Sequence, residues 1–147
     1  MWRLLVGGIV IAVMLWPRPA AAQEECPVDA ATPEETAGVL YGQYLAGGQW
    51  DMAYDTLHPE AQIRLAFPVF ASMAQTEAVL GPLVDVQVLP AQASPGWTWG
   101  LTGLRFTNVA EVPVRYTVGT PAGPVTTAKV VALAQVGNCW RWLPALQ

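Results

Sequence analysis

The stretch of sequence that decides the fold runs from Gln49 to Glu60 and reads Gln-Trp-Asp-Met-Ala-Tyr-Asp-Thr-Leu-His-Pro-Glu. Its apolar residues recur three or four positions apart: Trp50, Ala53, Tyr54 and Leu57. This spacing predicts an amphipathic helix with one buried face. A proline ring disfavours the helical conformation of the preceding residue, so we expect the helix to end at His58. We predict that Trp50, Tyr54 and Leu57 belong to the structural core.

An earlier helix is predicted from residue 33 to about residue 46. Thr32 supplies an N-cap, Pro33 suits the first helical position, and Glu35 completes a capping box. Its inner face holds apolar residues at helical spacing: Ala37, Leu40, Tyr41, Tyr44 and Leu45. Gly47 and Gly48 are expected to end it. Two further helical segments are predicted, over residues 59–66 and from residue 68 to about residue 81.

Beyond Pro82 the apolar residues alternate with polar ones, which is typical of half-buried strands. Strands are predicted over residues 84–88, 97–106, 112–118, 125–136 and 139–143. The phase slips at Thr102–Gly103, which predicts a bulge or bend within one strand. Pro113 has no backbone N–H, so its strand needs a free edge or a local break there. Helices followed by strands predict an α+β fold with N-terminal helices packed on a strongly curved antiparallel sheet of four to five strands.

Residues 1–22 have the pattern of a secretory signal peptide. Arg3 gives a positive start, an apolar run follows to Trp16, and the segment ends in Ala20-Ala21-Ala22. The alternative is an uncleaved membrane anchor, although the apolar run is shorter than the roughly 20 residues that a spanning helix needs. We therefore expect an exported protein, periplasmic or extracellular. A lead-in over residues 23–31 and a single domain over residues 32–147 follow.

The charge of the chain excludes some classes of partner. Loss of Arg3 and Arg18 with the signal leaves a mature net charge of about −6. Nucleic acid is excluded as a partner because it is bound through basic patches. Contact with a membrane is expected only through the signal segment.

The two cysteines, Cys26 and Cys139, stand near the two ends of the mature chain. An even pair in an exported protein favours a disulfide over a metal site. A bridge between them would contribute on the order of 4 kcal/mol in the chain-entropy model. Two unrelated buried thiols are the alternative.

The sequence offers little catalytic chemistry. His58 is the only histidine, and its place before Pro59 favours a capping role over acid–base catalysis. Asp85 is predicted to face away from the valines beside it, and no pair of carboxylates is predicted to point inward. We assign no catalytic residue, no metal ligand and no cofactor.

Aromatic side chains are numerous for one small domain, and they divide into two predicted groups. Those expected in the core are Trp50, Tyr54, Trp140 and Trp142. Those predicted as candidates for lining a ligand pocket are Tyr41, Trp97, Trp99 and Tyr116.

Two motifs, Trp50…Ala53-Tyr54…Leu57-His58-Pro59 and Trp140-Arg141-Trp142, give the chain a resemblance to the nuclear-transport-factor-2-like superfamily. The resemblance covers nearly the whole mature chain and is greatest to exported members of unknown function. It implies a cone-shaped, cystatin-like α+β fold that encloses a mostly apolar cavity.

We therefore expect a non-catalytic domain that binds a small apolar ligand or a protein partner in or on this cone. One alternative is a small cofactor-independent isomerase or dehydratase that uses Tyr41, Tyr116 or His58. Another is a homodimer that associates through the sheet.

Overall fold

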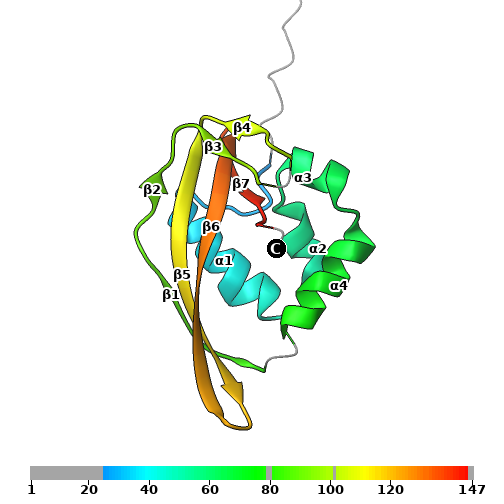
Figure 1. Ribbon diagram of the computed structural model, residues 1–147, viewed down its shortest axis with the longest axis vertical. Helices are drawn as coiled ribbons and strands as arrows, with labels where there is room; N and C mark the ends of the chain where they lie inside the picture. Colours follow the sequence, from blue (N-terminus) through cyan, green and yellow to red (C-terminus); the bar gives the residue numbers. More distant parts are fainter. Residues whose placement is uncertain (1–24, 79–80, 101, 146–147) are drawn as a thin grey trace, which may run out of the picture.

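The computed structural model describes residues 25–78, 81–100 and 102–145. Within these ranges the chain forms four α-helices, one π-helical segment, a five-stranded sheet and a two-stranded sheet (Figure 1). The helices precede the sheets in the sequence, as predicted for an α+β fold. The predicted signal peptide, residues 1–22, lies outside the described residues.

The first helix begins at the predicted cap. In α1 (Pro33–Val39) the Thr32 hydroxyl accepts a hydrogen bond from the Glu35 N–H at 3.2 Å. The Glu35 carboxylate reaches back to accept from the Ala31 N–H at 3.0 Å. The helix then continues as a π-helical segment, η1 (Leu40–Leu45), which the sequence did not predict. Gly48, with a φ of 69°, follows in the turn that leads to the next helix.

Two short connections separate the remaining helices, which are α2 (Trp50–Asp55), α3 (Pro59–Arg64) and α4 (Phe67–Ala78). His58 adopts an extended conformation between α2 and α3, in agreement with the predicted helix end. Its ring Nδ1 accepts a hydrogen bond from the Glu60 N–H at 3.1 Å and so caps α3. Figure 1 shows α1 lying against the sheet, with α3 and α4 on the far side of the helical layer.

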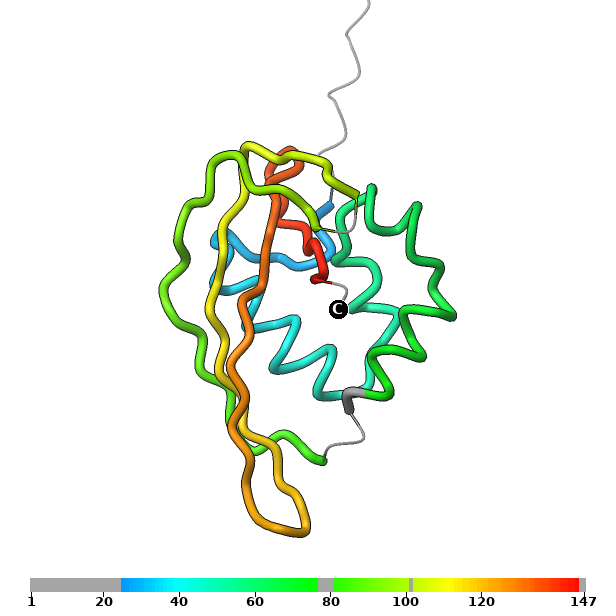
Figure 2. Tube along the Cα trace, in the orientation of Figure 1, coloured from blue at the N-terminus to red at the C-terminus, as the bar shows by residue number. Residues whose placement is uncertain are grey.

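The main sheet has the strand order β1-β5-β6-β7, and β2 pairs with β5 beyond the end of β1. Its strands are β1 (Leu83–Val88), β2 (Gln92–Ala93), β5 (Val109–Thr120), β6 (Gly123–Val136) and β7 (Cys139–Leu143). All these pairings are antiparallel. The β5–β6 hairpin is long, and its tip extends past the helices (Figure 2).

The region predicted as one strand over residues 97–106 is instead a hairpin. β3 (Trp97–Thr98) pairs antiparallel with β4 (Arg105–Phe106). The N–H groups of Thr102 and Gly103 both donate to the Trp99 carbonyl, and Gly103 has a φ of 71°. The phase slip at Thr102–Gly103 therefore marks a chain reversal, for which a glycine with positive φ is suited.

The structure corrects the predicted pattern at the start of β1 and explains the position of Pro113 in β5. Asp85 was predicted to face away from the valines on either side of it, but the register shifts between Leu83 and Asp85, and Val84, which is 65% exposed, is exposed together with Asp85. Pro113 lies in an internal strand, opposite the gap between β1 and β2. Its carbonyl points to that gap and accepts from the Leu89 N–H at 2.9 Å. The missing N–H of Pro113 therefore falls at a local break in pairing.

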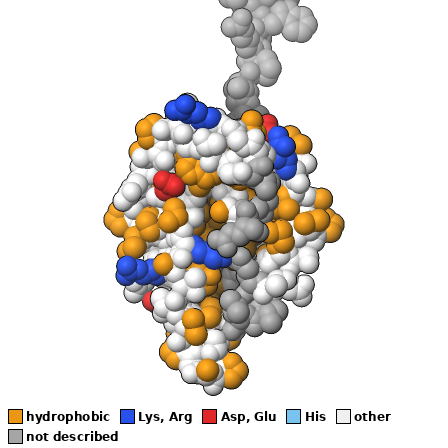
Figure 3. Space-filling model, in the orientation of Figure 1, with side chains coloured by type: hydrophobic (Ala, Val, Ile, Leu, Met, Phe, Trp, Pro, Cys, Tyr) orange, Lys and Arg blue, Asp and Glu red, His pale blue; other side chains and the backbone are white. Residues whose placement is uncertain are grey.

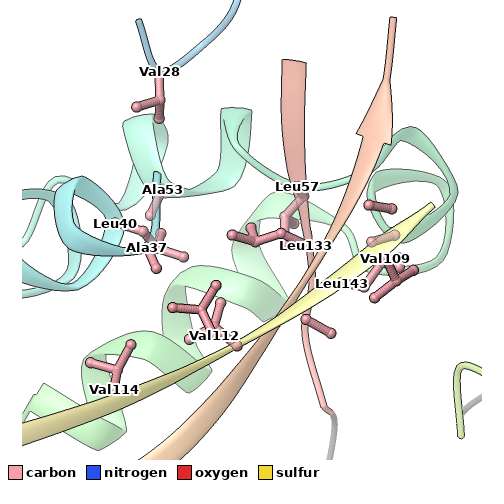
Figure 4. Close-up of a cluster of buried hydrophobic side chains, with 14 of the residues drawn as sticks. Val28, Ala37, Leu40, Ala53, Leu57, Val109, Val112, Val114, Leu133 and Leu143 are labelled. Carbon is pink, nitrogen blue, oxygen red and sulfur yellow. The ribbon is translucent and has the colours of Figure 1, made fainter. Parts of the chain in front are cut away.

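The core lies between the helices and the inner face of the sheet. Figure 4 shows side chains from the lead-in, α1, α2 and the strands converging there. Fully buried members include Ala37, Leu40, Ala53, Leu57, Val112, Val114 and Leu133. The predicted core residue Leu57 is fully buried, and Tyr54, Trp140 and Trp142 pack against the core while partly exposed. Trp50, in contrast, is partly exposed and is not among the side chains packed on this cluster.

A disulfide joins Cys26 to Cys139, across 113 positions of sequence, as predicted. It fixes the lead-in to β7, and two further contacts hold the lead-in in place. Val28 is buried in the core, and the Tyr44 hydroxyl donates to the Pro27 carbonyl at 3.4 Å. Among the described residues, no helix is long and apolar enough to cross a membrane.

Candidate ligand cavity

A cavity of about 660 Å³ lies between the helices and the half of the sheet that is nearer to the turn between β5 and β6. Its walls come from η1, α4, β1, β5, β6 and the segment after β7. The lining side chains are mostly apolar or aromatic and include Tyr41, Leu45, Phe70, Met73, Ala74, Leu83, Tyr116, Val118, Lys129 and Trp142. On the face shown in Figure 3, hydrophobic side chains (orange) are spread among white atoms, with a few Lys and Arg (blue) and Asp and Glu (red) side chains between them.

Aromatic rings form a continuous wall in this cavity. The ring centres of Tyr41 and Tyr116 lie 5.9 Å apart, and those of Tyr41 and Trp142 lie 6.5 Å apart in an edge-to-face arrangement. Phe70 continues the contact from α4, with its ring 6.0 Å from that of Trp142. Offset and edge-to-face pairs at these distances are favourable arrangements for aromatic rings. Two of the four predicted pocket residues, Tyr41 and Tyr116, are therefore brought together.

The π-helical segment contributes directly to this wall. Both Tyr41 and Leu45 belong to η1, and both line the cavity. A π-helical turn contains one more residue than an α-helical turn, and such turns are frequent at functional sites. Leu40 and Tyr44 of the same segment are buried in the core. The segment thus presents one pair of side chains to the core and another pair to the cavity.

Lys129 is a residue of the cavity lining that the sequence reasoning missed. It lies on β6 opposite Val114 of β5, on the same face as Tyr116 and the buried Val131 and Leu133. Its ammonium is 5.9 Å from the centre of the Tyr116 ring, within the range of a cation–π contact. The alternation along β6 places residue 129 in phase with the inward residues 131 and 133. That phase is the signal from which its position was predictable.

The other two predicted pocket residues, Trp97 and Trp99, lie elsewhere. Trp99 is buried, and its indole N–H donates to the Pro144 carbonyl at 2.9 Å. The indole N–H of Trp97 donates to the Glu111 carboxylate at 3.2 Å, on the opposite face of β5 from Tyr116. The β3–β4 hairpin therefore covers the outer face of the sheet. This cover explains why β6 is buried on both faces at Ala132 and Leu133.

His58 does not face the cavity. It caps α3, and its ring packs edge-to-face on Phe106 at 5.1 Å. Burial lowers the pKa of His58 below its ordinary value of 6.5; nearby Glu60 acts to raise this pKa and Arg141 to lower it. The Nδ1 atom accepts a hydrogen bond, so the ring is neutral, with its proton on Nε2. This geometry supports the capping role predicted from the sequence.

A second hollow lies beside the disulfide and has a volume of about 440 Å³. It is lined by Glu25, Cys26, Pro27, Met52, Asp55, Gln62 and Arg141. Arg141 donates from Nη1 to the Asp55 carbonyl at 2.8 Å, which ties β7 to the end of α2. Because this hollow has a polar rim and lacks an aromatic wall, the larger cavity is the stronger candidate site.

The described lining of the larger cavity restricts its chemistry. It includes no histidine and no carboxylate, and Lys129 is its one charged side chain. No group of three or more histidine, cysteine, aspartate or glutamate side chains that could hold a metal ion occurs in the described part of the chain. Among the described side chains of this lining, the groups able to transfer a proton are the phenols of Tyr41 and Tyr116 and the amine of Lys129.

Comparison with known proteins shows a likeness in fold alone. No family model matches the chain, and no curated protein matches it. A SEC-C motif containing protein from Psychrobacter arcticus has a similar structure, with a TM-score of 0.57 and 16% identity over 80% of this chain. The chain spans 61% of that protein's length. A SEC-C motif containing protein from Rhodopseudomonas palustris matches with a TM-score of 0.51 and 14% identity, over 80% of this chain and 77% of that one.

These matches correct the resemblance to the nuclear-transport-factor-2-like superfamily, which was wrong. The structurally similar proteins are described as SEC-C motif containing proteins. The helical spacing around Trp50 and the final Trp140-Arg141-Trp142 strand describe helices placed before a sheet. Unrelated families share such a layout, so these motifs indicate an architecture and not a descent. What the comparisons show is an α+β fold shared at low sequence identity.

Proposed function

We propose that this chain is a non-catalytic domain that binds a small apolar ligand in the cavity between its helices and its sheet. The observation that carries the proposal is the cavity of about 660 Å³ with Tyr41, Phe70, Tyr116 and Trp142 on its walls. Ligand sites in proteins are typically about 300–1,000 Å³ and are lined by apolar and aromatic groups with a few polar ones. The size and the lining of this cavity both match that description.

An exported location is part of the proposal. The Cys26–Cys139 disulfide is compatible with an oxidising compartment. The signal-peptide pattern of residues 1–22 points to the same compartment. A domain outside the cytoplasm would meet its ligand in the periplasm or the surrounding medium.

The proposal is tested by the binding of N-phenyl-1-naphthylamine, a neutral dye that fluoresces in apolar surroundings. Ala74 of α4 lines the cavity, so Ala74→Phe would place a ring inside it. Gln75 is exposed on the same helix, and Gln75→Phe is the matched control. We expect saturable binding by the unaltered protein, a loss of affinity of about tenfold or more for Ala74→Phe, and little change for Gln75→Phe.

Val118→Phe repeats this test from the opposite wall of the cavity, on the face of β5 that also carries Tyr116. It serves if Ala74→Phe does not fold. Dye binding that fails to saturate, or that responds equally to the cavity variants and to Gln75→Phe, would overturn the proposal.

A second candidate function is a small isomerase or dehydratase. One observation favours it: Tyr41 and Tyr116 meet in the cavity, and phenol groups can donate hydrogen bonds to a developing oxyanion. It ranks second because the described lining includes neither a carboxylate nor a histidine to act as the base. Exchange of deuterium into cyclohexanone in D₂O, faster than in buffer and abolished by Tyr116→Phe, would support it.

A further inference from the structure

The position of Lys129 is unusual for a lysine in this chain. It is the only lysine in the 147 residues, and it faces the cavity instead of the outer surface. The final strand pairs with β6 only from Ala132 onward, opposite Leu143. Lys129 lies three positions before that point, in the part of β6 that does not pair with β7. Its side chain lines the cavity there. The ammonium of the one lysine in the sequence therefore belongs to the lining of the cavity.

We propose that the ligand of this cavity is an amphipathic anion, an apolar molecule with one carboxylate or sulfonate group that binds Lys129. This inference rests on the proposed function and specifies its ligand class. The apolar body would lie against Tyr41, Phe70 and Trp142, and the anionic group would lie near the ammonium beside Tyr116.

Electrostatics support this assignment. Charged groups attract each other more strongly beside an apolar wall than in bulk water, because the local dielectric constant is lower. The described lining includes no carboxylate that would repel an anion. The chain as a whole carries a net charge of −4, so its general field opposes the approach of anions. Binding of an anion here depends on a local cation, and Lys129 is the one on the described walls.

The neighbouring ring strengthens the same argument. The ammonium of Lys129 lies over the Tyr116 ring, which fixes it near the middle of the aromatic wall. A lysine that served solubility alone would place its ammonium in water. Lys129 lies partly buried on the inward face of β6. This placement puts the ammonium among the side chains that line the cavity.

The experiment compares two dyes that share one aromatic body. The first is 8-anilinonaphthalene-1-sulfonate, and the second is the neutral N-phenyl-1-naphthylamine. Lys129→Met removes the charge and keeps the length of the side chain. Arg115→Met removes one positive charge from an exposed position on the opposite face of β5 and is the matched control.

We expect Lys129→Met to weaken binding of the sulfonate dye about tenfold or more, while affinity for the neutral dye changes less than about twofold. Arg115→Met should leave both affinities nearly unchanged. If the neutral dye binds but Lys129→Met affects both dyes alike, or neither, this inference is overturned and the proposed function stands. If neither dye binds the unaltered protein, the proposed function itself fails.

A second measurement avoids substitution altogether. Reductive methylation with ¹³C-formaldehyde labels the ε-amine of Lys129 and the α-amine of the chain, because there is no other lysine. We expect the Lys129 methyl resonance to shift when the sulfonate dye saturates the protein. An unmoved resonance at saturation would overturn the inference.

Discussion

His58 caps α3 with a ring nitrogen, and the partial burial of its ring makes the stability of the fold depend on pH. Burial lowers the pKa of His58 below 6.5, outweighing the opposite effect of Glu60, and Arg141 lowers it further. As the pH falls below 6.5, the unfolded chain takes up a proton at this residue more readily than the folded chain does. The free energy of unfolding must therefore decrease through that window and level off below the lowered pKa.

We predict that His58→Asn removes this part of the pH dependence. Asparagine can still accept a hydrogen bond as an N-cap, but it does not titrate. Urea unfolding at a series of pH values between 5 and 8 would measure the difference between the two proteins. The gap in unfolding free energy should change in favour of the asparagine variant as the pH falls below 6.5. A gap that is constant across the series would show that His58 stays equally protonated in both states.

At the same scale, the sequence predicted some residue roles and missed others. The role of His58 followed from Pro59 beside it, and the cap at Thr32 followed from a local pattern. Lys129 was missed because the alternation along β6 gives the face of the sheet on which a residue lies, whereas the lining of a cavity depends on how the sheet and the helices assemble. Trp97 and Trp99 were assigned to the pocket because an alternating pattern does not state which face of a sheet it belongs to.

Among the elements, the π-helical segment offers a direct test of local geometry. Gly42 lies within η1, and a Cβ atom added there would contact nothing within 4 Å. We predict that Gly42→Ala raises the free energy of unfolding by about 0.5–1 kcal/mol, because it restricts the unfolded chain without a clash. Chemical denaturation would measure the change.

Gly48 supplies the contrast for this prediction. It has a φ of 69°, a conformation that alanine adopts at a cost of about 1–2 kcal/mol. Gly48→Ala should therefore destabilise the protein. If Gly42→Ala and Gly48→Ala changed the free energy of unfolding equally, the result would contradict the backbone conformations of these two glycines.

The helices were easier to predict from sequence than the strand pairings. Helix starts are determined by residues three or four positions apart, as at Thr32 and His58. The β3–β4 hairpin and the bulge at Val84 depend instead on which strands pair. The hairpin was predicted as one strand with a bulge or bend at Thr102–Gly103, and residues 84–88 were predicted as a strand of continuous alternation. The predicted break in pairing at Pro113 was confirmed, because a residue without a backbone N–H cannot donate to any neighbouring strand.

For the whole molecule, the disulfide joins the two ends of the described fold. It links positions 113 apart, and the chain-entropy model assigns such a loop a stabilisation of about 4–5 kcal/mol. We predict that the double variant Cys26→Ser/Cys139→Ser loses a stability of this order. Denaturation of the variant and of the unaltered protein, with and without a reductant, would measure it. A reductant that leaves the unfolding midpoint of the unaltered protein unchanged would contradict the prediction.

At this scale the sequence predicted the architecture and not the ancestry. The order of helices before an antiparallel sheet followed from local patterns, and the Cys26–Cys139 pairing followed from the presence of just two cysteines in a chain predicted to be exported. The family resemblance was wrong. Motifs such as Trp140-Arg141-Trp142 reflect how a strand packs against helices, and unrelated families pack their strands in the same way.

The central claim is that the space between Tyr41, Tyr116 and α4 is a ligand site. A crystal structure of the protein grown with 8-anilinonaphthalene-1-sulfonate tests it most directly. We predict electron density for the naphthalene body against the aromatic wall, with the sulfonate near the Lys129 ammonium. A structure in which the chain's own side chains fill this space, or in which the dye binds only elsewhere, would contradict the claim.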